Sequence, residues 1–386
     1  EAVPKYKSNG EAYSEVKIKE MHTTMQTLGR FAIVGGTVII SLANVILFQG
    51  VDKLDDNEKI NLYANIYLYA LSIPLLSVIG VLIASFQKRN KFNNKKYKHI
   101  VEDSHRRIEI NWTILIGSLL FVFFSVGVGA LKLPYAQEIV FCGSTGIILF
   151  LMSKLISELE ENQRLMIVGT AIIIFVFRAI PIPGPALTWF EIDQLFFNEH
   201  FISILTLLSS VLALIGIIVL RPFMSNNSIP KIIIILSVAS SILFLPSVGM
   251  YYGLHEWTSS FTNGVVDAKF IAVINTSIES PLAQVSMIPL LVWIAKNAPA
   301  QMKATFFAVF ASFTNLALSA SALTTKYLNQ IFVVTREVKD KLTGEVISSA
   351  NYSELGFLLI LIFFTTLVLP IGAVLIVQKS RFKTTD

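Results

Sequence analysis

Ten stretches of this 386-residue chain are apolar over the roughly 20 residues that a helix needs to cross a bilayer, which limits the fold more than any other feature. Hydrophobic residues make up 54% of the chain and charged residues 15%, which excludes a water-soluble protein. Backbone groups in lipid must be satisfied within each segment, so we expect helices, and the runs lack the alternation of β-barrel strands. The predicted fold class is an all-α, polytopic helical membrane protein. The ten predicted spans are Gly29–Phe48, Leu62–Ser85, Ile110–Leu131, Pro134–Leu155, Arg164–Ile180, Phe201–Leu220, Ile229–Met250, Ala268–Ala295, Met302–Leu323 and Leu355–Val377.

The basic residues gather in loops between these spans, above all in residues 87–109. The positive-inside rule places that loop in the cytoplasm, and alternation of the spans then puts both ends of the chain in the cytoplasm. This orientation places residues 325–354 outside the cytoplasm although they contain four basic residues, which argues against it. The loop is long and also contains acidic residues, so it counts less as evidence about orientation. Membrane topology explains the net charge of +5, and no nucleic-acid partner is predicted.

Glu279 interrupts the apolar stretch Ala268–Lys296 about eleven residues from its start, roughly 16 Å along a helix and therefore near the middle of the bilayer. A carboxyl at this depth costs about 3 kcal/mol or more, so such groups line water-filled cavities or meet a partner. Asn275 lies one turn earlier, and Ser280 and Gln284 lie on an adjoining face. This acid in a chain of many spans suggests a transport pathway.

The polar stripe around Glu279 allows two interpretations. Pro281 and Pro289 follow it and predict an irregular helix beside a cavity. The same polar groups are also compatible with a structural hydrogen-bond network between packed helices. We favour the cavity because ionisable groups are expensive at this depth.

Arg178 closes an apolar run and precedes the sequence Ala-Ile-Pro-Ile-Pro-Gly-Pro. If the helix ends near Pro181, Arg178 is an interfacial residue whose charge reaches water. If the helix continues to about Asp193, Arg178 lies deep and its planar guanidinium can hold a carboxylate. The residues alone leave both alternatives open.

Two other polar groups fall inside predicted spans. Gln26 and Arg30 open the first span and either face a cavity or, in the case of Arg30, anchor the helix at the membrane surface. Asn315 and three nearby serines form a small polar face on the ninth span, which suits substrate contact or close helix packing.

The sequence gives little support for a metal site, an enzyme active site or a bound cofactor. The five histidines lie in loops or at helix ends without metal-ligand spacing, so no metal site is predicted. We find no glycine-rich phosphate loop and no nucleophile–base motif, so an enzyme and a cofactor are not expected. Cys142 is the single cysteine, which rules out an intrachain disulfide.

Several segments, in order along the chain, resemble the folate–biopterin transporter family of the major facilitator superfamily. Residues 25–29 (Met-Gln-Thr-Leu-Gly) look like the Gly-Ser-Leu-Gln-Ser motif of the family's first matching span, with Gln26 in the Gln position. The further segments that resemble the family are Phe177–Pro181, Phe190–Phe201, Gln284 with Pro289, Ala304–Ala308 with Asn315, and Asn351–Gly356.

The resemblance covers most of residues 164–378 and, more weakly, 1–85. It implies that four N-terminal helices of a twelve-helix pattern are absent from this chain. The domains expected on this basis are residues 1–85 (two spans ending an N-terminal half), 86–109 (the basic cytoplasmic loop), 110–157 (two additional spans) and 158–386 (a six-helix C-terminal half). The two additional spans depart from the family pattern. Asp193 departs as well, since the family often has Thr-Asn near this position. Because of both departures, the resemblance does not determine the identity of the substrate.

The family's cavity is lined partly by its seventh and tenth helices, which here carry Arg178 and Glu279. The resulting hypothesis is a secondary active transporter that rocks between two states. Arg178, Gln284, Asn315 and Gln26 would bind a folate-like, pterin-like or other small organic anion, and Glu279 would take up a proton during symport. The alternatives are a carrier of nucleosides or peptides and a non-transporting membrane assembly factor of the same fold.

Overall fold

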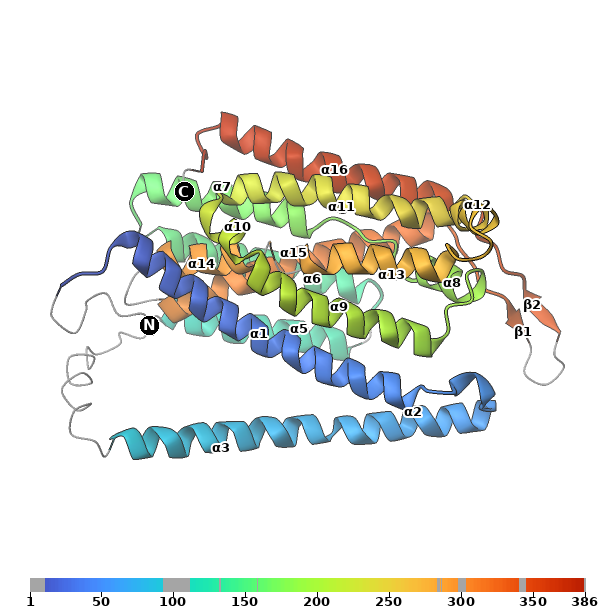
Figure 1. Ribbon diagram of the computed structural model, residues 1–386. Helices are drawn as coiled ribbons and strands as arrows, with labels where there is room; N and C mark the ends of the chain where they lie inside the picture. The colour runs from blue at the N-terminus through green and yellow to red at the C-terminus, as the bar shows by residue number, and fades with distance from the viewer. Residues whose placement is uncertain are drawn as a thin grey trace.

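The computed structural model describes residues 11–92, 112–131, 133–157, 159–282, 285, 287–297, 303–339 and 345–384 (Figure 1). Most of the predicted basic loop at 86–109 lies outside the described residues, and so does the predicted site residue Gln284.

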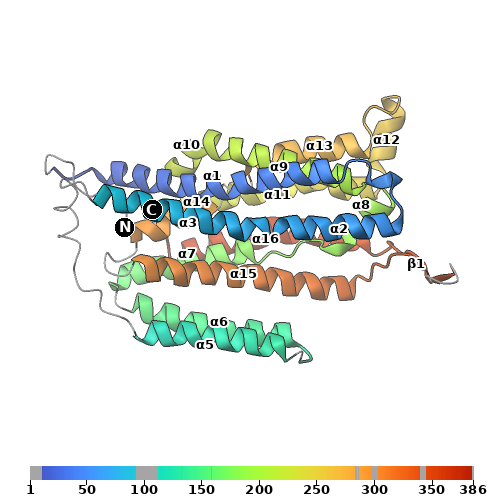
Figure 2. The same ribbon diagram turned by 90° about the horizontal axis from the view of Figure 1, so that it is seen from below.

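The long helices run roughly side by side and form an elongated bundle (Figures 1 and 2). The first part of the chain forms α1 (Glu15–Leu47), η1 (Val51–Lys53), α2 (Asp56–Ala70), α3 (Ser72–Phe92), α5 (Trp112–Ala130) and α6 (Ala136–Ile156). The second part forms α7 (Glu161–Arg178), α8 (Pro185–Asp193), α9 (Glu199–Val219), α10 (Arg221–Asn226), α11 (Ile229–Tyr251), α12 (Leu254–Phe261), α13 (Ala268–Glu279), η3 (Ser280–Leu282), α14 (Met287–Asn297), α15 (Lys303–Ile331), β1 (Val338–Lys339), β2 (Val346–Ser348) and α16 (Leu355–Lys379). We call the end where α1 begins and α16 ends the terminal end; α8, α12 and the antiparallel β1–β2 pair lie at the opposite end.

Seven helical segments among the described residues are long and apolar enough to cross a membrane, which confirms the predicted all-α polytopic fold. They are Glu20–Lys53, Asn57–Phe86, Ala136–Ile156, Glu199–Val219, Ile229–Tyr251, Thr305–Ile331 and Leu355–Lys379. Each coincides with one of the ten spans predicted from the sequence. The stretch predicted at 110–131 forms α5, whose apolar part, Leu115–Ala130, is shorter than these seven segments. The remaining two predicted spans belong to helices that break inside the bundle.

The first broken helix is the pair α7 and α8. Helix α7 ends at Arg178, and the chain resumes as α8 after a segment containing Pro181, Pro183 and Gly184. Prolines cannot donate the hydrogen bonds of a continuing helix, and Gly184 has a φ of 66°, in the left-handed region that favours glycine.

Side chains of α15 satisfy the backbone of this break. Ser321 Oγ donates to the Ile180 carbonyl at 2.6 Å, and Thr325 Oγ1 accepts from the Ile182 N–H at 3.0 Å. Asn329 Nδ2 donates to the Pro183 carbonyl at 3.1 Å. Backbone groups away from water need such partners, so α15 makes the break stable inside the bundle.

The break answers the question left open for Arg178. Its helix does end close to Pro181, but α8 continues toward the opposite end, so the end of α7 is not the end of the bundle (Figure 1). Near the terminal end, Gly169 lies against the Phe382 carbonyl. Arg178 is nine residues further along α7, about 13 Å at 1.5 Å per residue. It therefore lies inside the bundle rather than at its surface end.

The second broken helix is α13, η3 and α14, where one continuous span was predicted. Helix α13 ends at Glu279 and tightens into the 3₁₀ turn η3 around Pro281 before α14 begins at Met287. Pro281 has no N–H to offer the carbonyl of Ser277, which interrupts the helical ladder at this point. The irregularity predicted from Pro281 is confirmed, and it falls directly after the acid.

The helices around these breaks come from distant parts of the sequence. Helix α1 packs along α9 and α14, α11 packs on α16, and α15 lies between α7 and α6. Val34 of α1 joins buried residues of α9, α11 and α14 in one hydrophobic cluster. Residues 72–86 of α3, by contrast, are exposed throughout and predominantly apolar, as expected for a surface that faces hydrocarbon or other helices in a membrane.

Candidate functional site

A cavity of about 710 Å³ lies between the broken helix α13–η3 and helices α1, α9 and α11. We call it the Glu279 cavity. Its volume falls within the range of typical small-molecule sites, about 300–1,000 Å³. Its walls are mostly hydroxyl-bearing and aliphatic side chains: Thr37, Phe177, Leu205, Thr206, Ser209, Ser210, Leu236, Ser240, Thr276, Glu279, Ser280 and Leu282.

Glu279 is the only ionisable group among these described lining residues. It is the last residue of α13, and its side chain is exposed to the cavity. An acid at a helix C-terminus gains nothing from the helix dipole, which favours cations there. The helix dipole therefore gives no reason for a carboxyl at this position. The cavity location is the one expected of a functional acid within a membrane.

The hydroxyl groups give the cavity its polar character. Ser210 Oγ donates to the Thr206 carbonyl at 2.8 Å, and Thr206 Oγ1 donates to the Ile202 carbonyl at 2.9 Å. Ser280 Oγ donates in the same way to the Thr276 carbonyl at 2.5 Å. A hydroxyl that donates to its own helix keeps lone pairs for a ligand. The cavity can thus accept hydrogen bonds from a ligand and exchange a proton with it or with water at Glu279.

Arg178 lies beside this cavity rather than in its wall, since the preceding residue, Phe177, lines it. Arg178 Nη1 donates to Met287 Sδ of α14 at 2.9 Å, and a thioether is a weak acceptor. Its Nε is buried and has no hydrogen-bond partner in the part of the chain that the structure describes. The guanidinium is thus held by a weak acceptor and leaves its Nε donor unused within the described residues.

A second arginine adds to the positive charge at this point. Arg30 of α1 is half-buried and close enough to Arg178 for the two like charges to repel. Neither arginine forms an ion pair with an acidic side chain within the described ranges. Two arginines whose charges repel, with no acidic ion-pair partner among the described residues, would be stabilised by an anionic group.

One face of α1 connects the arginines to the cavity. Gln26 and Arg30 are four residues apart and therefore on the same face, and Thr37 lies seven residues beyond Arg30. This spacing is about 10 Å along the helix, and Thr37 reaches the Glu279 cavity. Arg178 and Glu279 lie at the α7 and α13 breaks, and the part of Gln26 in the same site stays a prediction.

Asn315 does not line the Glu279 cavity. It lines a separate cavity of about 1,060 Å³ between the α5–α6 pair and α15, together with Ser312 and Ser319. Its predicted role in substrate binding stays a prediction, as does that of Gln284, which lies outside the described residues. Among the described residues we find no cluster of three or more metal-ligating side chains.

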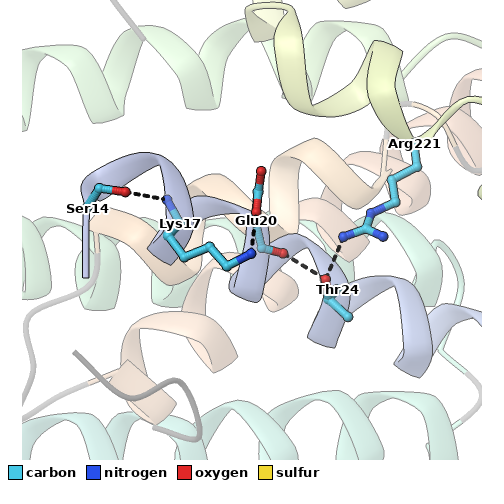
Figure 3. A network of polar contacts seen from close by, with 5 residues as sticks. All are labelled: Ser14, Lys17, Glu20, Thr24 and Arg221. Carbon is cyan, nitrogen blue, oxygen red and sulfur yellow. Dashed lines mark hydrogen bonds and ion pairs between the residues drawn. The ribbon is translucent and has the colours of Figure 1, made fainter. Parts of the chain in front are cut away.

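Polar contacts at the two ends of the bundle were not predicted. At the terminal end, Arg221 Nη2 of α10 donates to Thr24 Oγ1 of α1 at 2.6 Å (Figure 3). Thr24 Oγ1 in turn donates to the Glu20 carbonyl at 2.8 Å, and Lys17 pairs with the Glu20 carboxylate at 2.9 Å. This network ties α1 to the segment that follows α9. The signal available in the sequence was only an Arg-Pro pair after an apolar span.

At the opposite end, Asp193 of α8 is held by the loop that precedes α16. Arg336 donates Nε to Asp193 Oδ2 at 2.8 Å and Nη2 to Oδ1, and Tyr352 OH donates to Oδ2 at 2.6 Å. The Arg336 hydrogen bond is the main reason why the pKa of Asp193 lies below its ordinary value. Burial, followed by the bond to Asp193, raises the pKa of Tyr352 to about 12. Contacts between residues more than 140 positions apart leave no local signal in the sequence.

The fold and this region together define a multi-pass helical membrane protein with a polar, acid-containing cavity inside its bundle. The family model described as the BT1 family matches residues 20–385, so the chain belongs to the BT1 family, the folate–biopterin transporter family suggested by its sequence motifs.

Two relatives are similar over part of the chain. Folate transporter 2 of Plasmodium falciparum is 24% identical over 166 residues, which cover 43% of this chain and 35% of that protein. A Plasmodium berghei protein that provisionally bears the same name is 22% identical over 193 residues, which cover 50% of this chain and 41% of that protein. The matches thus span less than half of these relatives. No solved structure matches the chain.

Proposed function

We propose that this protein carries a folate-like or pterin-like organic anion across a membrane by proton-coupled alternating access, in a major-facilitator-like fold. The observation that carries the proposal is the position of Glu279, an acid at a helix break that faces a cavity within the bundle. Membership of the BT1 family and the similarity to proteins named as folate transporters support the substrate class.

Arg178 and Arg30 bind the anionic group of the substrate in this mechanism. Their charges repel each other in the absence of an anion, and the Nε of Arg178 is a buried donor without a partner among the described residues. A carboxylate between them would accept charge-assisted hydrogen bonds, of which an arginine can form two in parallel. Phe177, which precedes Arg178 in α7 and lines the cavity, offers an aromatic surface to a planar ring.

Glu279 carries the proton. A charged carboxyl is costly within the membrane, so protonation before the cavity changes sides removes that cost. Since Glu279 is the one acid of the described cavity wall, the expected stoichiometry is one proton per substrate.

One of the polar contacts described above, between α1 and α10, joins the two halves and acts as a closure, whereas the Asp193 contact lies within residues 158–386 and stabilises the C-terminal half itself. The α1–α10 contact at Thr24 and Arg221 would close the terminal end, which we assign to the cytoplasm, and would separate when that end opens. Helix α1 belongs to the N-terminal half and α9–α10 to the C-terminal half, so rocking of the halves moves these residues apart.

The test is uptake by proteoliposomes that contain the full-length protein, with a panel of pterins, folates and other small anions, with and without a pH gradient. One proton per substrate means that each pH unit can support about tenfold accumulation, since it supplies about 1.4 kcal/mol. We expect Glu279→Gln to abolish accumulation driven by the pH gradient while exchange of substrate across the membrane continues.

A matched control is Glu256→Gln, which removes an exposed acid of α12 far from the cavity. It should accumulate substrate like the unaltered protein. Full proton coupling in Glu279→Gln would refute the proposed role of the acid. Absence of uptake for every anion of the panel by a folded protein would favour the non-transporting alternative.

A further inference from the structure

The second cavity, between the α5–α6 pair and α15, has the features of a lipid site. We call it the α15 cavity. It extends along α15 from Ser312 to Lys326, fourteen residues or about 21 Å. One leaflet of a hydrocarbon core is about 15 Å thick, so a lipid chain fits along this length. Phe121, Phe141 and Leu316 contribute apolar wall.

A charged pair stands at one end of this cavity. Lys326 Nζ of α15 lies 2.6 Å from Glu138 Oε1 of α6, and both residues line the cavity. Tyr327 OH donates to the same oxygen at 2.6 Å. The other carboxylate oxygen, Glu138 Oε2, is buried and has no hydrogen-bond partner in the described part of the chain.

These contacts leave a complementary pair of unused groups. Glu138 Oε2 keeps its lone pairs and can accept a hydrogen bond from a donor while Oε1 stays bound to Lys326 and Tyr327. Lys326 has three ammonium hydrogens, of which Glu138 Oε1 occupies one. A ligand that offers both an ammonium donor and an anionic oxygen would satisfy both groups.

The surroundings place this charged end at a membrane surface. Tyr135 and Tyr327 are exposed beside it, and tyrosines gather where the hydrocarbon meets the headgroups. The charged pair lies at the opposite end of the bundle, at the start of α6 and near the end of α15.

We propose that the α15 cavity binds a phospholipid whose headgroup carries a primary ammonium, as in phosphatidylethanolamine. The ammonium donates to Glu138, the phosphate accepts from Lys326, and one acyl chain lies along α15 past Ser319 toward Ser312. The site is separate from the Glu279 cavity, and the lipid would hold the α5–α6 pair against α15. The proposal does not depend on the transported substrate.

The experiment measures lipid binding to the purified full-length protein by native mass spectrometry and by its thermal unfolding in detergent. Phosphatidylethanolamine, phosphatidylcholine and phosphatidylglycerol with the same short acyl chains are compared. A phosphocholine headgroup has no N–H to donate and a phosphoglycerol headgroup has no cation. We expect phosphatidylethanolamine to bind about tenfold more tightly than either, as one additional charge-assisted hydrogen bond would give.

Three variants test the assignment to this cavity. Glu138→Gln should abolish the preference for phosphatidylethanolamine over phosphatidylcholine, and the comparison within the variant remains valid even if the variant is less stable. Ser319→Phe should fill the cavity and remove binding of all three lipids. Glu256→Gln, which alters an acid at the same end outside the cavity, should keep the preference.

Equal binding of the three lipids by the unaltered protein would overturn the proposal, and so would a preference for phosphatidylglycerol. It would also be overturned if Glu138→Gln kept the preference, or if Ser319→Phe folded and bound lipid as before. Displacement of the lipid by a soluble pterin or folate would instead identify this cavity as a substrate site and would likewise refute it.

Discussion

The contact between Asp193, Arg336 and Tyr352 allows us to predict how much a substitution of Asp193 lowers the free energy of unfolding. Asp193→Asn removes the charge that accepts two hydrogen bonds from Arg336 and one from Tyr352. The Asp193 side chain is 22% exposed and that of Arg336 is 43% exposed, so water screens the pair and a fully buried value does not apply. We expect a loss of about 1–2 kcal/mol in the free energy of unfolding.

The loss depends on pH in a direction that follows from the pKa of Asp193. The Arg336 hydrogen bond lowers this pKa in the folded protein, so the contact stabilises the fold while the pH is above the ordinary value of about 4. The stabilisation disappears as the pH falls through the folded-state pKa. The difference between the unaltered protein and Asp193→Asn should therefore be constant from about pH 5 to 7 and should shrink below about pH 4.

The assay is the apparent melting temperature of the full-length protein in detergent across this pH range. For a large domain, about 1 kcal/mol corresponds to a shift of about 2–4 °C. Glu256→Gln, which removes an exposed acid at the same end, serves as the control and should melt like the unaltered protein. No difference at pH 7, or a difference that persists undiminished at pH 3, would show that Asp193 does not hold the loop as described.

Three further variants test other parts of the structure. Gly216→Val should destabilise the protein by about 1–3 kcal/mol, measured by thermal unfolding, because a Cβ at this position would overlap the backbone of Pro281 and push α9 from the α13 break; an unchanged melting temperature would contradict that close contact. Arg178→Met should raise the KM for uptake about 10–100-fold through the loss of a charge-assisted bond to the substrate, and Arg178→Lys should restore only part of it because the planar fork is lost; an unchanged KM in Arg178→Met would remove this residue from the site. Arg221→Met should change the distribution between the two access states, measured by cysteine labelling of α1 near Thr24, because it removes the α1–α10 contact; equal labelling would contradict its role as a closure.

The two broken helices have a common feature. Helix α7 ends at Arg178 and α13 ends at Glu279, so both residues stand at helix termini inside the bundle. Backbone that leaves the helical ladder at this depth must be satisfied by protein, as Ser321 and Thr325 do for the α7–α8 break, or must line a cavity, as α13–η3 does. A bundle built only for stability would avoid both breaks.

The amino-acid sequence by itself determined the class of fold and most of the helices. Apolar runs of about 20 residues can satisfy their backbone in lipid only as helices, so their length and composition decide the outcome without knowledge of the neighbours. The same local reasoning predicted Glu279 as an acid deep in the bilayer, which stays a prediction, and Pro281 as a source of irregularity, which the break after α13 confirms, since a proline interrupts the ladder wherever the helix lies.

Only the tertiary structure shows which of the polar residues line the same cavity. Arg178 and Glu279 both lie at breaks, but Asn315, which the sequence pattern grouped with them, lines a separate cavity because α15 turns that face toward α5 and α6. The charge repulsion between Arg30 and Arg178 and the bond from Arg336 to Asp193 depend on packing between segments far apart in the chain. Periodicity and composition show whether one segment can form a membrane-spanning helix. The partner of a side chain depends on how the helices pack, and a local sequence pattern does not encode that packing.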